Sequence, residues 1–131
     1  MIKYQLIQLQ TNPAYAGTAE GKTMLFFKKT DINQAVEACR KTPDGVLLDV
    51  REEDEFLSGH IPGAESVPLS RIGGIRISKQ KALFVYCLRG ARSKRAVGIL
   101  KQMGYTNARS IGGIAAYKGR LEHGKALKQE C

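Results

Sequence analysis

The chain has 131 residues, which is enough for one domain with a hydrophobic core. Its content of 43% hydrophobic and 25% charged residues is ordinary for a soluble globular protein. Three cysteines without regular spacing exclude a disulfide framework. Only two histidines occur, His60 and His123, and no Cys/His cluster has metal-ligand spacing, so no metal site is expected.

The formal net charge of +9 comes from 21 Lys and Arg residues against 12 Asp and Glu residues. Such a balance is compatible with nucleic acid, an anionic membrane surface or small anionic substrates. The positive residues are spread along the chain, no basic block is interleaved with aromatic residues, and tryptophan is absent. We therefore expect a solvated basic surface and no nucleic-acid partner.

No stretch approaches the length of a membrane span, so no membrane association is expected. Residues 1–23 are polar and lack sustained periodicity, which predicts a flexible N-terminal extension. Polar side chains also interrupt the apolar core that a secretory signal would need. A cytoplasmic location, where thiols stay reduced, is the resulting prediction.

An apolar run opens at Met24, and a helix is predicted to begin after Asp31, a plausible N-cap with Gln34 three residues on. Apolar residues then recur at helical spacing and place Cys39 on the buried side of that helix. This position predicts a structural role for Cys39.

Residues 42–45 are a strong turn signal, and residues 46–50 read as a buried parallel strand. Asp49 and Arg51 bracket the end of that strand, where we expect them to pair and hold the neighbouring loops. A short acidic helix over 52–57 follows. His60 stands in a tight turn and is predicted to bond to the backbone.

A short strand is predicted at 65–68, and a linker around Gly73 and Gly74. The next strand, 82–86, leads directly into Cys87, and a helix follows that ends at Gly104. A further strand over 108–111 and a short closing helix over 112–117 complete the pattern. Strands alternating with helices predict an α/β fold with a central, mainly parallel sheet flanked by helices.

Cys87 lies at the carboxyl end of a predicted strand, where sites form in such folds. The loop after it leads into a helix N-terminus, whose N–H groups and dipole favour negative charge. Arg89 and Arg92 add two positive charges, so the loop is predicted to hold Cys87 as a nucleophilic thiolate. The candidate substrate-binding residues are those of the loop itself: Leu88, Arg89, Gly90, Ala91, Arg92 and Ser93.

The two arginines are predicted to differ in role. Arg89 stands in the body of the loop, and we expect its side chain to point toward the mouth of the site. Arg92 opens the following helix, where a cation is unfavourable beside the N-terminal end of the dipole. A bound anion is the expected compensation.

Four motifs in chain order resemble the rhodanese-like domain family, over roughly residues 24–124. They are 48–51 with the acidic residues after it, 59–64, the loop from 85 to 93, and Gly112–Gly113 with Tyr117. The resemblance implies a single rhodanese-like domain, followed by a C-terminal tail over 125–131 in which Cys131 is expected to be a bystander. It also implies a sulfurtransferase that carries a persulfide on Cys87.

In this chemistry the thiolate takes the outer sulfur of a small anionic donor, thiosulfate or a persulfide, and passes it to a thiol or a protein cysteine. No cofactor is required, because a thiolate with a lowered pKa is already formed at neutral pH. The loop differs from the commonest family pattern in one position. An arginine often follows the cysteine directly, whereas this chain has Leu88 there and Arg89 next.

Two other functions stay open at this point. A phosphatase or arsenate reductase of related fold uses a cysteine and an arginine separated by five residues, whereas four residues separate Cys87 from Arg92. The third possibility is a non-catalytic interaction module of the same fold. A thiolate site has no structural need for its positive charge, which favours the enzyme.

Overall fold

The computed structural model describes residues 31–125. The predictions for the N-terminal extension, for the apolar run at Met24 and for Cys131 lie outside the described residues. Within 31–125 the elements in chain order are α1 (Ile32–Lys41), β2 (Gly45–Asp49), α2 (Glu53–Ser58), β3 (Glu65–Ser66), the 3-10 helix η2 (Leu69–Gly74), β4 (Ala82–Cys87), α3 (Ala91–Gln102), β5 (Ala108–Gly113) and the 3-10 helix η3 (Ile114–Ala116).

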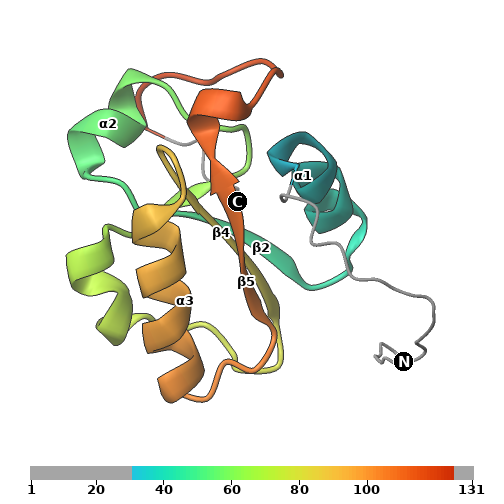
Figure 1. Cartoon of the computed structure of the whole chain (residues 1–131), viewed down its shortest axis with the longest axis vertical. Coiled ribbons are helices and arrows are strands. Elements are labelled where there is room, and N and C mark those ends of the chain that lie inside the picture. The colour runs from blue at the N-terminus through green and yellow to red at the C-terminus, as the bar shows by residue number, and fades with distance from the viewer. Residues whose placement is uncertain (1–30, 126–131) are drawn as a thin grey trace.

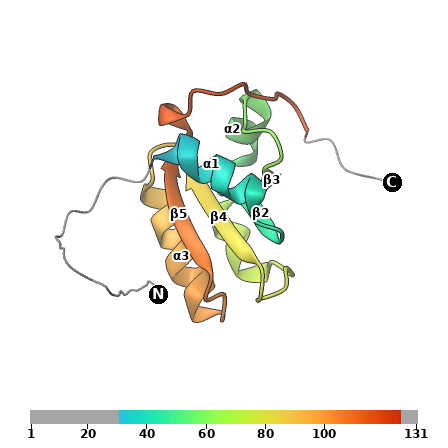
Figure 2. The ribbon, with the colours of Figure 1, turned by 90° about the vertical axis from the view of Figure 1, so that its right-hand side faces the viewer.

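The strands form one parallel sheet in the order β3-β2-β4-β5. Helix α1 covers one face of the sheet, and α3 with η2 covers the other (Figure 1). Figure 2 shows the arrowheads of β4 and β5 at the same end of the sheet. The predicted α/β fold with a central parallel sheet is therefore confirmed.

Strand β4 is central, and all six of its residues are buried. Its side chains alternate between two hydrophobic clusters, one on each face of the sheet. Phe84 and Tyr86 pack on the α1 face, whereas Val85 and Cys87 pack on the α3 face. A strand covered on both faces needs a continuous apolar run, which is the pattern that identified it in the sequence.

Helix α1 begins where the sequence indicates. The Asp31 carboxylate accepts the backbone N–H of Asn33 at 2.9 Å and caps the helix. Ile32, Val36 and Cys39 form its buried side. The prediction that Cys39 is a core residue is confirmed.

Two local predictions were wrong. Gly73 and Gly74 do not form a linker, since they end helix η2, which is anchored by the buried Ile72. The expected closing helix over 112–117 is a single 3-10 turn, because Gly112 and Gly113 extend strand β5. The pairing of β5 with β4 shifts after Val85, and this irregularity lets the strand continue past Ile111.

Asp49 and Arg51 form the buried ion pair that the sequence predicts. Arg51 Nη2 lies 2.8 Å from Asp49 Oδ2, and the guanidinium also donates to the carbonyl of Gly59 at 2.7 Å. Both side chains are at most 6% exposed. The pair therefore fastens the end of β2 to the loop that follows α2.

The Asp49→Ala variant should be strongly destabilised, because it leaves the Arg51 guanidinium buried without its partner. We expect the free energy of unfolding to fall by about 3–5 kcal/mol, measured by urea denaturation. Glu37→Ala is the matched control, since it breaks the exposed pair of Glu37 with Arg40. It should cost less than about 1 kcal/mol. Equal losses in the two variants would contradict the structural role of the buried pair.

Candidate active site

Cys87 is the last residue of the central strand β4, and its side chain is only 1% exposed. The loop Leu88–Gly90 separates it from the first turn of α3. A parallel strand that ends in a tight loop before a helix points peptide N–H groups back at the strand end. The sequence therefore fixes both the position of the sulfur and the groups that surround it.

Two backbone N–H groups donate to the Cys87 sulfur. The distances to Sγ are 3.0 Å from the Gly90 nitrogen and 3.3 Å from the Ser93 nitrogen. Burial raises the pKa of the Cys87 thiol, but hydrogen bonds from the loop outweigh it, so the net pKa lies below its ordinary value. The largest of these contributions come from Ser93, followed by the backbone of Gly90 and Arg89.

Two sources of stabilisation are expected from the sequence, the N–H groups at the helix start and the charges of Arg89 and Arg92. Hydrogen bonds from Ser93 and from the loop backbone make the leading favourable contributions, so the first source is the larger one. The direction is the expected one, since the net pKa of the Cys87 thiol is lowered. Peptide dipoles held in fixed positions have a further advantage, since they need no reorganisation when the negative charge on the sulfur changes.

Two glycines allow the loop to close tightly. Gly90 has a φ of +114°, a backbone conformation that residues other than glycine rarely adopt. Its N–H is one of the donors to the sulfur. Gly113, at the end of β5, lies directly under the loop. A Cβ atom there would be 2.0 Å from the carbonyl oxygen of Leu88, so only glycine permits this approach.

Ser93 ties the start of α3 to β5. Its hydroxyl is fully buried and lies 3.0 Å from the Gly90 carbonyl and 2.7 Å from the hydroxyl of Ser110. Ser93 is among the predicted loop residues, but its contact with Ser110 is not expected from the sequence. Ser110 stands 17 residues away on strand β5, where no local pattern marks it as a partner.

Arg92 forms an ion pair with Glu55 of helix α2. The distances are 2.7 Å from Nη1 to Oε1 and 3.1 Å from Nη2 to Oε2, a two-pronged arrangement. The hydrogen bond to Arg92 lowers the pKa of Glu55 to about 2. The charge of Arg92 is thus compensated by a carboxylate of this chain, and the expected bound anion is not needed for that purpose.

The remaining loop residues face outward to different degrees. Arg89 and Ala91 are exposed, and Leu88 is half-buried. The Leu88 carbonyl accepts the N–H of Ala115 at 3.1 Å, which fastens the loop to η3. The orientation of Arg89 toward an entering donor stays a prediction.

His60 is a fully buried structural residue rather than a partner of the cysteine. Its Nδ1 lies 2.9 Å from the Phe56 carbonyl oxygen, and its ring stacks on Phe56 with centroids 3.7 Å apart. Its other nitrogen, Nε2, is 3.7 Å from the Glu122 carboxylate. The predicted bond from a turn histidine to the backbone is confirmed, but Nε2 is buried and makes no hydrogen bond within the described residues, so the expected full satisfaction of the ring is wrong.

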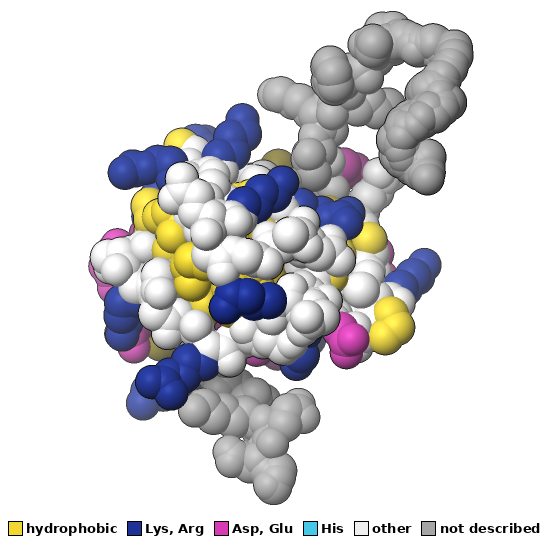
Figure 3. All heavy atoms as spheres, turned by 90° about the horizontal axis from the view of Figure 1, so that it is seen from below, with side chains coloured by type: hydrophobic (Ala, Val, Ile, Leu, Met, Phe, Trp, Pro, Cys, Tyr) yellow, Lys and Arg dark blue, Asp and Glu magenta, His cyan; other side chains and the backbone are white. Residues whose placement is uncertain are grey.

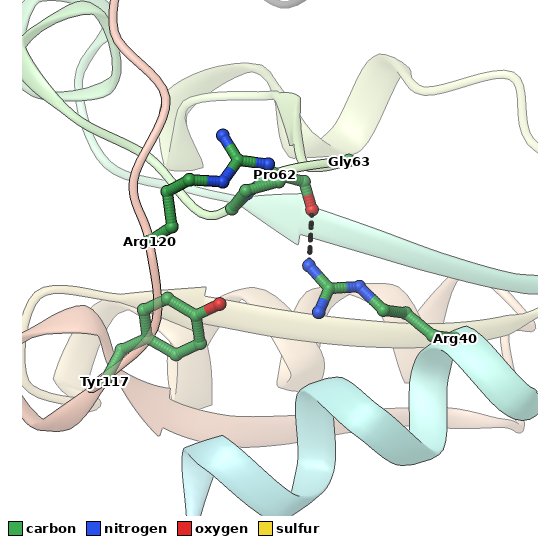
Figure 4. A pocket seen from close by; sticks show the side chains of 5 residues that line it. All are labelled: Arg40, Pro62, Gly63, Tyr117 and Arg120. Atoms are coloured by element: carbon green, nitrogen blue, oxygen red, sulfur yellow. Dashed lines mark hydrogen bonds between the residues drawn. The ribbon is translucent and has the colours of Figure 1, made fainter.

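A pocket of about 490 Å³ lies apart from the sulfur, between the end of α1, the loop at Pro62–Gly63 and the segment after η3 (Figure 4). Arg40 lines it and donates to the Pro62 carbonyl at 3.0 Å. Tyr117, another lining residue, packs with the α1-side cluster, whereas Cys87 belongs to the α3-side cluster. The pocket is therefore not the thiol cradle.

Positive side chains are scattered over the face of the molecule in Figure 3 rather than gathered in one patch. Within residues 31–125, no group of three or more His, Cys, Asp or Glu side chains could hold a metal ion. Over the same residues, no helix has both the length and the apolar character to span a membrane.

Comparison with known proteins identifies the family. Residues 31–120 match the rhodanese-like domain. Thiosulfate sulfurtransferase GlpE of Pseudoalteromonas translucida is 30% identical over 103 residues, which cover 73% of this chain and 97% of that protein. Uncharacterized protein YqhL of Bacillus subtilis is 37% identical over 79 residues, which cover 58% of this chain and 63% of that protein.

A solved structure agrees with these sequence matches. A rhodanese with anions from E. coli superposes with a TM-score of 0.56 and 31% identity, covering 60% of this chain and 98% of that chain. The family match extends over most of the chain and includes the strand, the loop and the helix that hold Cys87. The chain therefore belongs to the rhodanese-like domain family.

Proposed function

We propose that the protein is a sulfurtransferase that carries a sulfane sulfur as a persulfide on Cys87. The observation that supports this most is the buried sulfur with two peptide N–H donors within 3.3 Å and a lowered pKa. A lowered pKa increases the fraction of Cys87 present as thiolate, the nucleophilic form, and so reduces the need for a general base. Membership of a family that includes thiosulfate sulfurtransferases supports the same reaction.

The reaction has two steps. In the first, the Cys87 thiolate attacks the outer sulfur of thiosulfate, the S–S bond of the donor breaks, and sulfite leaves with the bonding electron pair. The product is a persulfide anion on Cys87, whose terminal sulfur can accept the loop N–H groups as an oxyanion would. In the second, a thiolate acceptor attacks that terminal sulfur and Cys87 leaves as the thiolate. A small thiol or a protein cysteine is the proposed acceptor.

The Glu55–Arg92 pair favours this function over phosphate chemistry. A phosphatase of related fold needs its loop arginine free to bracket a phosphate, whereas both terminal nitrogens of Arg92 are bound to Glu55. The loop is also one residue shorter, with four residues between Cys87 and Arg92. Because the cycle depends on a reduced thiol, a reducing compartment such as the cytoplasm is the proposed location.

Treatment of the purified protein with thiosulfate should raise its intact mass by one sulfur atom, because the sulfur remains on Cys87. Cyanide should remove that mass and release thiocyanate. Cys39→Ser is the matched control and should behave like the wild type. Thiocyanate formation by Cys87→Ser at the wild-type rate would refute the assignment.

The two buried cysteines should differ in reactivity. Burial raises the pKa of Cys39, whereas the loop N–H groups lower the pKa of Cys87 below its ordinary value. Near neutral pH a small alkylating reagent should therefore label Cys87 first, because the thiolate is the reacting form. Peptide mass spectrometry over a time course measures both rates. Faster labelling of Cys39 in the native protein would contradict the proposed thiolate.

The Gly113→Ala variant should lose activity without losing the fold, because its Cβ would push the Leu88 carbonyl and displace the N–H donors from sulfur. We expect kcat/KM for sulfur transfer to fall at least about tenfold. Gly98→Ala on the exposed side of α3 is the matched control, since nothing lies within 4 Å of its added Cβ. An active Gly113→Ala variant with unchanged circular dichroism would show that the close approach is dispensable.

A further inference from the structure

The ion pair between Glu55 and Arg92 changes the charge of the site from what the loop sequence suggests. The loop contains two arginines, but the charge of Arg92 is neutralised by a carboxylate at 2.7 Å. Each side chain is about one third exposed, 31% for Arg92 and 30% for Glu55. Arg92 stands in the first turn of α3, next to Ser93, whose N–H donates to the Cys87 sulfur at 3.3 Å. The pair therefore lies partly open to solvent at the rim of the loop that holds Cys87.

Arg92 is placed by its backbone beside the sulfur, since the N–H of the next residue, Ser93, donates to Cys87 Sγ at 3.3 Å. The hydrogen bond to Glu55 is the largest influence that raises the pKa of Arg92, and the Cys87 thiolate adds to it. An arginine that senses the thiolate would also sense a second anion placed against that sulfur. Glu55 weakens the attraction between Arg92 and such an anion, since its carboxylate forms an ion pair with the same guanidinium.

Helix α2 fixes Glu55 in this position. Glu55 Oε1 accepts the N–H of Glu52 at 3.0 Å as part of a capping box, and the next residue, Phe56, is buried in the core. With a pKa of about 2, Glu55 remains charged at every pH at which the thiolate could react. The negative charge at the rim is thus a permanent feature.

Donors differ in how much positive charge they require. Thiosulfate brings two negative charges to a thiolate and leaves as the sulfite dianion, so three negative charges share the site throughout the first step. A persulfide of an otherwise uncharged thiol brings at most one negative charge and leaves as a thiolate. In that case Cys87 attacks the outer sulfur, the donor S–S bond breaks, and the persulfide forms on Cys87 with the charge conserved.

We propose that Glu55 determines donor specificity: by neutralising Arg92 it favours persulfide donors of low charge over dianionic thiosulfate. Glu55 acts through Arg92 and is therefore a positioning residue that does not itself touch the sulfur. The inference rests on the proposed function of Cys87 and specifies the class of donor for that site.

The test compares Glu55→Gln with the wild type on two donors, thiosulfate and the persulfide of a neutral thiol, with persulfide formation on Cys87 as the readout. Glutamine keeps an oxygen for the N–H of Glu52, so the helix start is retained. The ratio of kcat/KM for thiosulfate to kcat/KM for the persulfide should rise about fivefold, the size of a partly screened charge interaction. The gain should appear mainly as a lower KM for thiosulfate.

Glu53→Gln is the matched control. Glu53 is exposed on the same short helix, so the substitution changes the net charge equally without touching Arg92. Its donor ratio should stay at the wild-type value. Raising the ionic strength should shrink the gain of Glu55→Gln, because a charge effect at the rim is screened by salt.

Arg92→Gln provides an independent measurement should Glu55→Gln fold poorly. It leaves the Glu55 carboxylate uncompensated, so the donor ratio should fall below the wild-type value. Equal changes for both donors in the two variants would overturn the inference and leave Glu55 a purely structural anchor. Failure of the proposed function looks different, since wild-type Cys87 would then gain no sulfur from either donor.

Discussion

The structure around Cys87 depends on one constraint, the placement of hydrogen-bond donors around an almost fully buried sulfur whose pKa is nevertheless lowered. A thiol that is 1% exposed would by burial alone resist ionisation, because a charge in a poorly solvated place costs free energy. The compensation comes from peptide N–H groups that converge on Sγ. These donors lie within six residues of the cysteine, so the loop can supply them only by folding back tightly over the end of β4.

Such a loop has to be held from several sides. Gly113 lets β5 pass directly beneath the Leu88 carbonyl, and Ala115 donates to that same carbonyl. Ser93 bonds to the loop backbone and to Ser110. Glu55 holds Arg92 from the opposite side. Three elements distant in sequence therefore fix the positions of the N–H donors, which is the arrangement that the proposed electrostatic preorganisation requires.

The sequence was a reliable guide where the determining contacts are local. The place of Cys87 follows from a buried strand next to a helix start, and the Asp49–Arg51 pair spans two residues. The buried position of Cys39 follows from the spacing of apolar residues on α1. Each of these depends on periodicity or on neighbours in the chain, and both can be seen in a single sequence.

The contacts that the sequence did not predict join distant segments. Glu55 and Arg92 are 37 residues apart in the sequence. Gly113, at the end of β5, approaches the backbone of Leu88, which follows the neighbouring strand β4. The acidic residues of α2 are visible in the sequence. Which of their carboxylates pairs with Arg92 depends on the position and rotation of α2 in the folded chain. The predicted helix over 112–117 is wrong for a related reason. The irregular pairing of β5 with β4 extends β5 through Gly112 and Gly113.

The net charge of the chain shows why local geometry decides the chemistry. A net charge of +9 suggests a site rich in free cations. One of the two loop arginines, however, is neutralised by Glu55, and hydrogen bonds from uncharged groups make the largest contributions that lower the pKa of Cys87. Charges elsewhere on the surface are screened over about 10 Å, whereas dipoles about 3 Å from a buried sulfur are screened much less. The field that the sulfur experiences is therefore a property of the loop fold, and the composition describes mainly the solvated exterior.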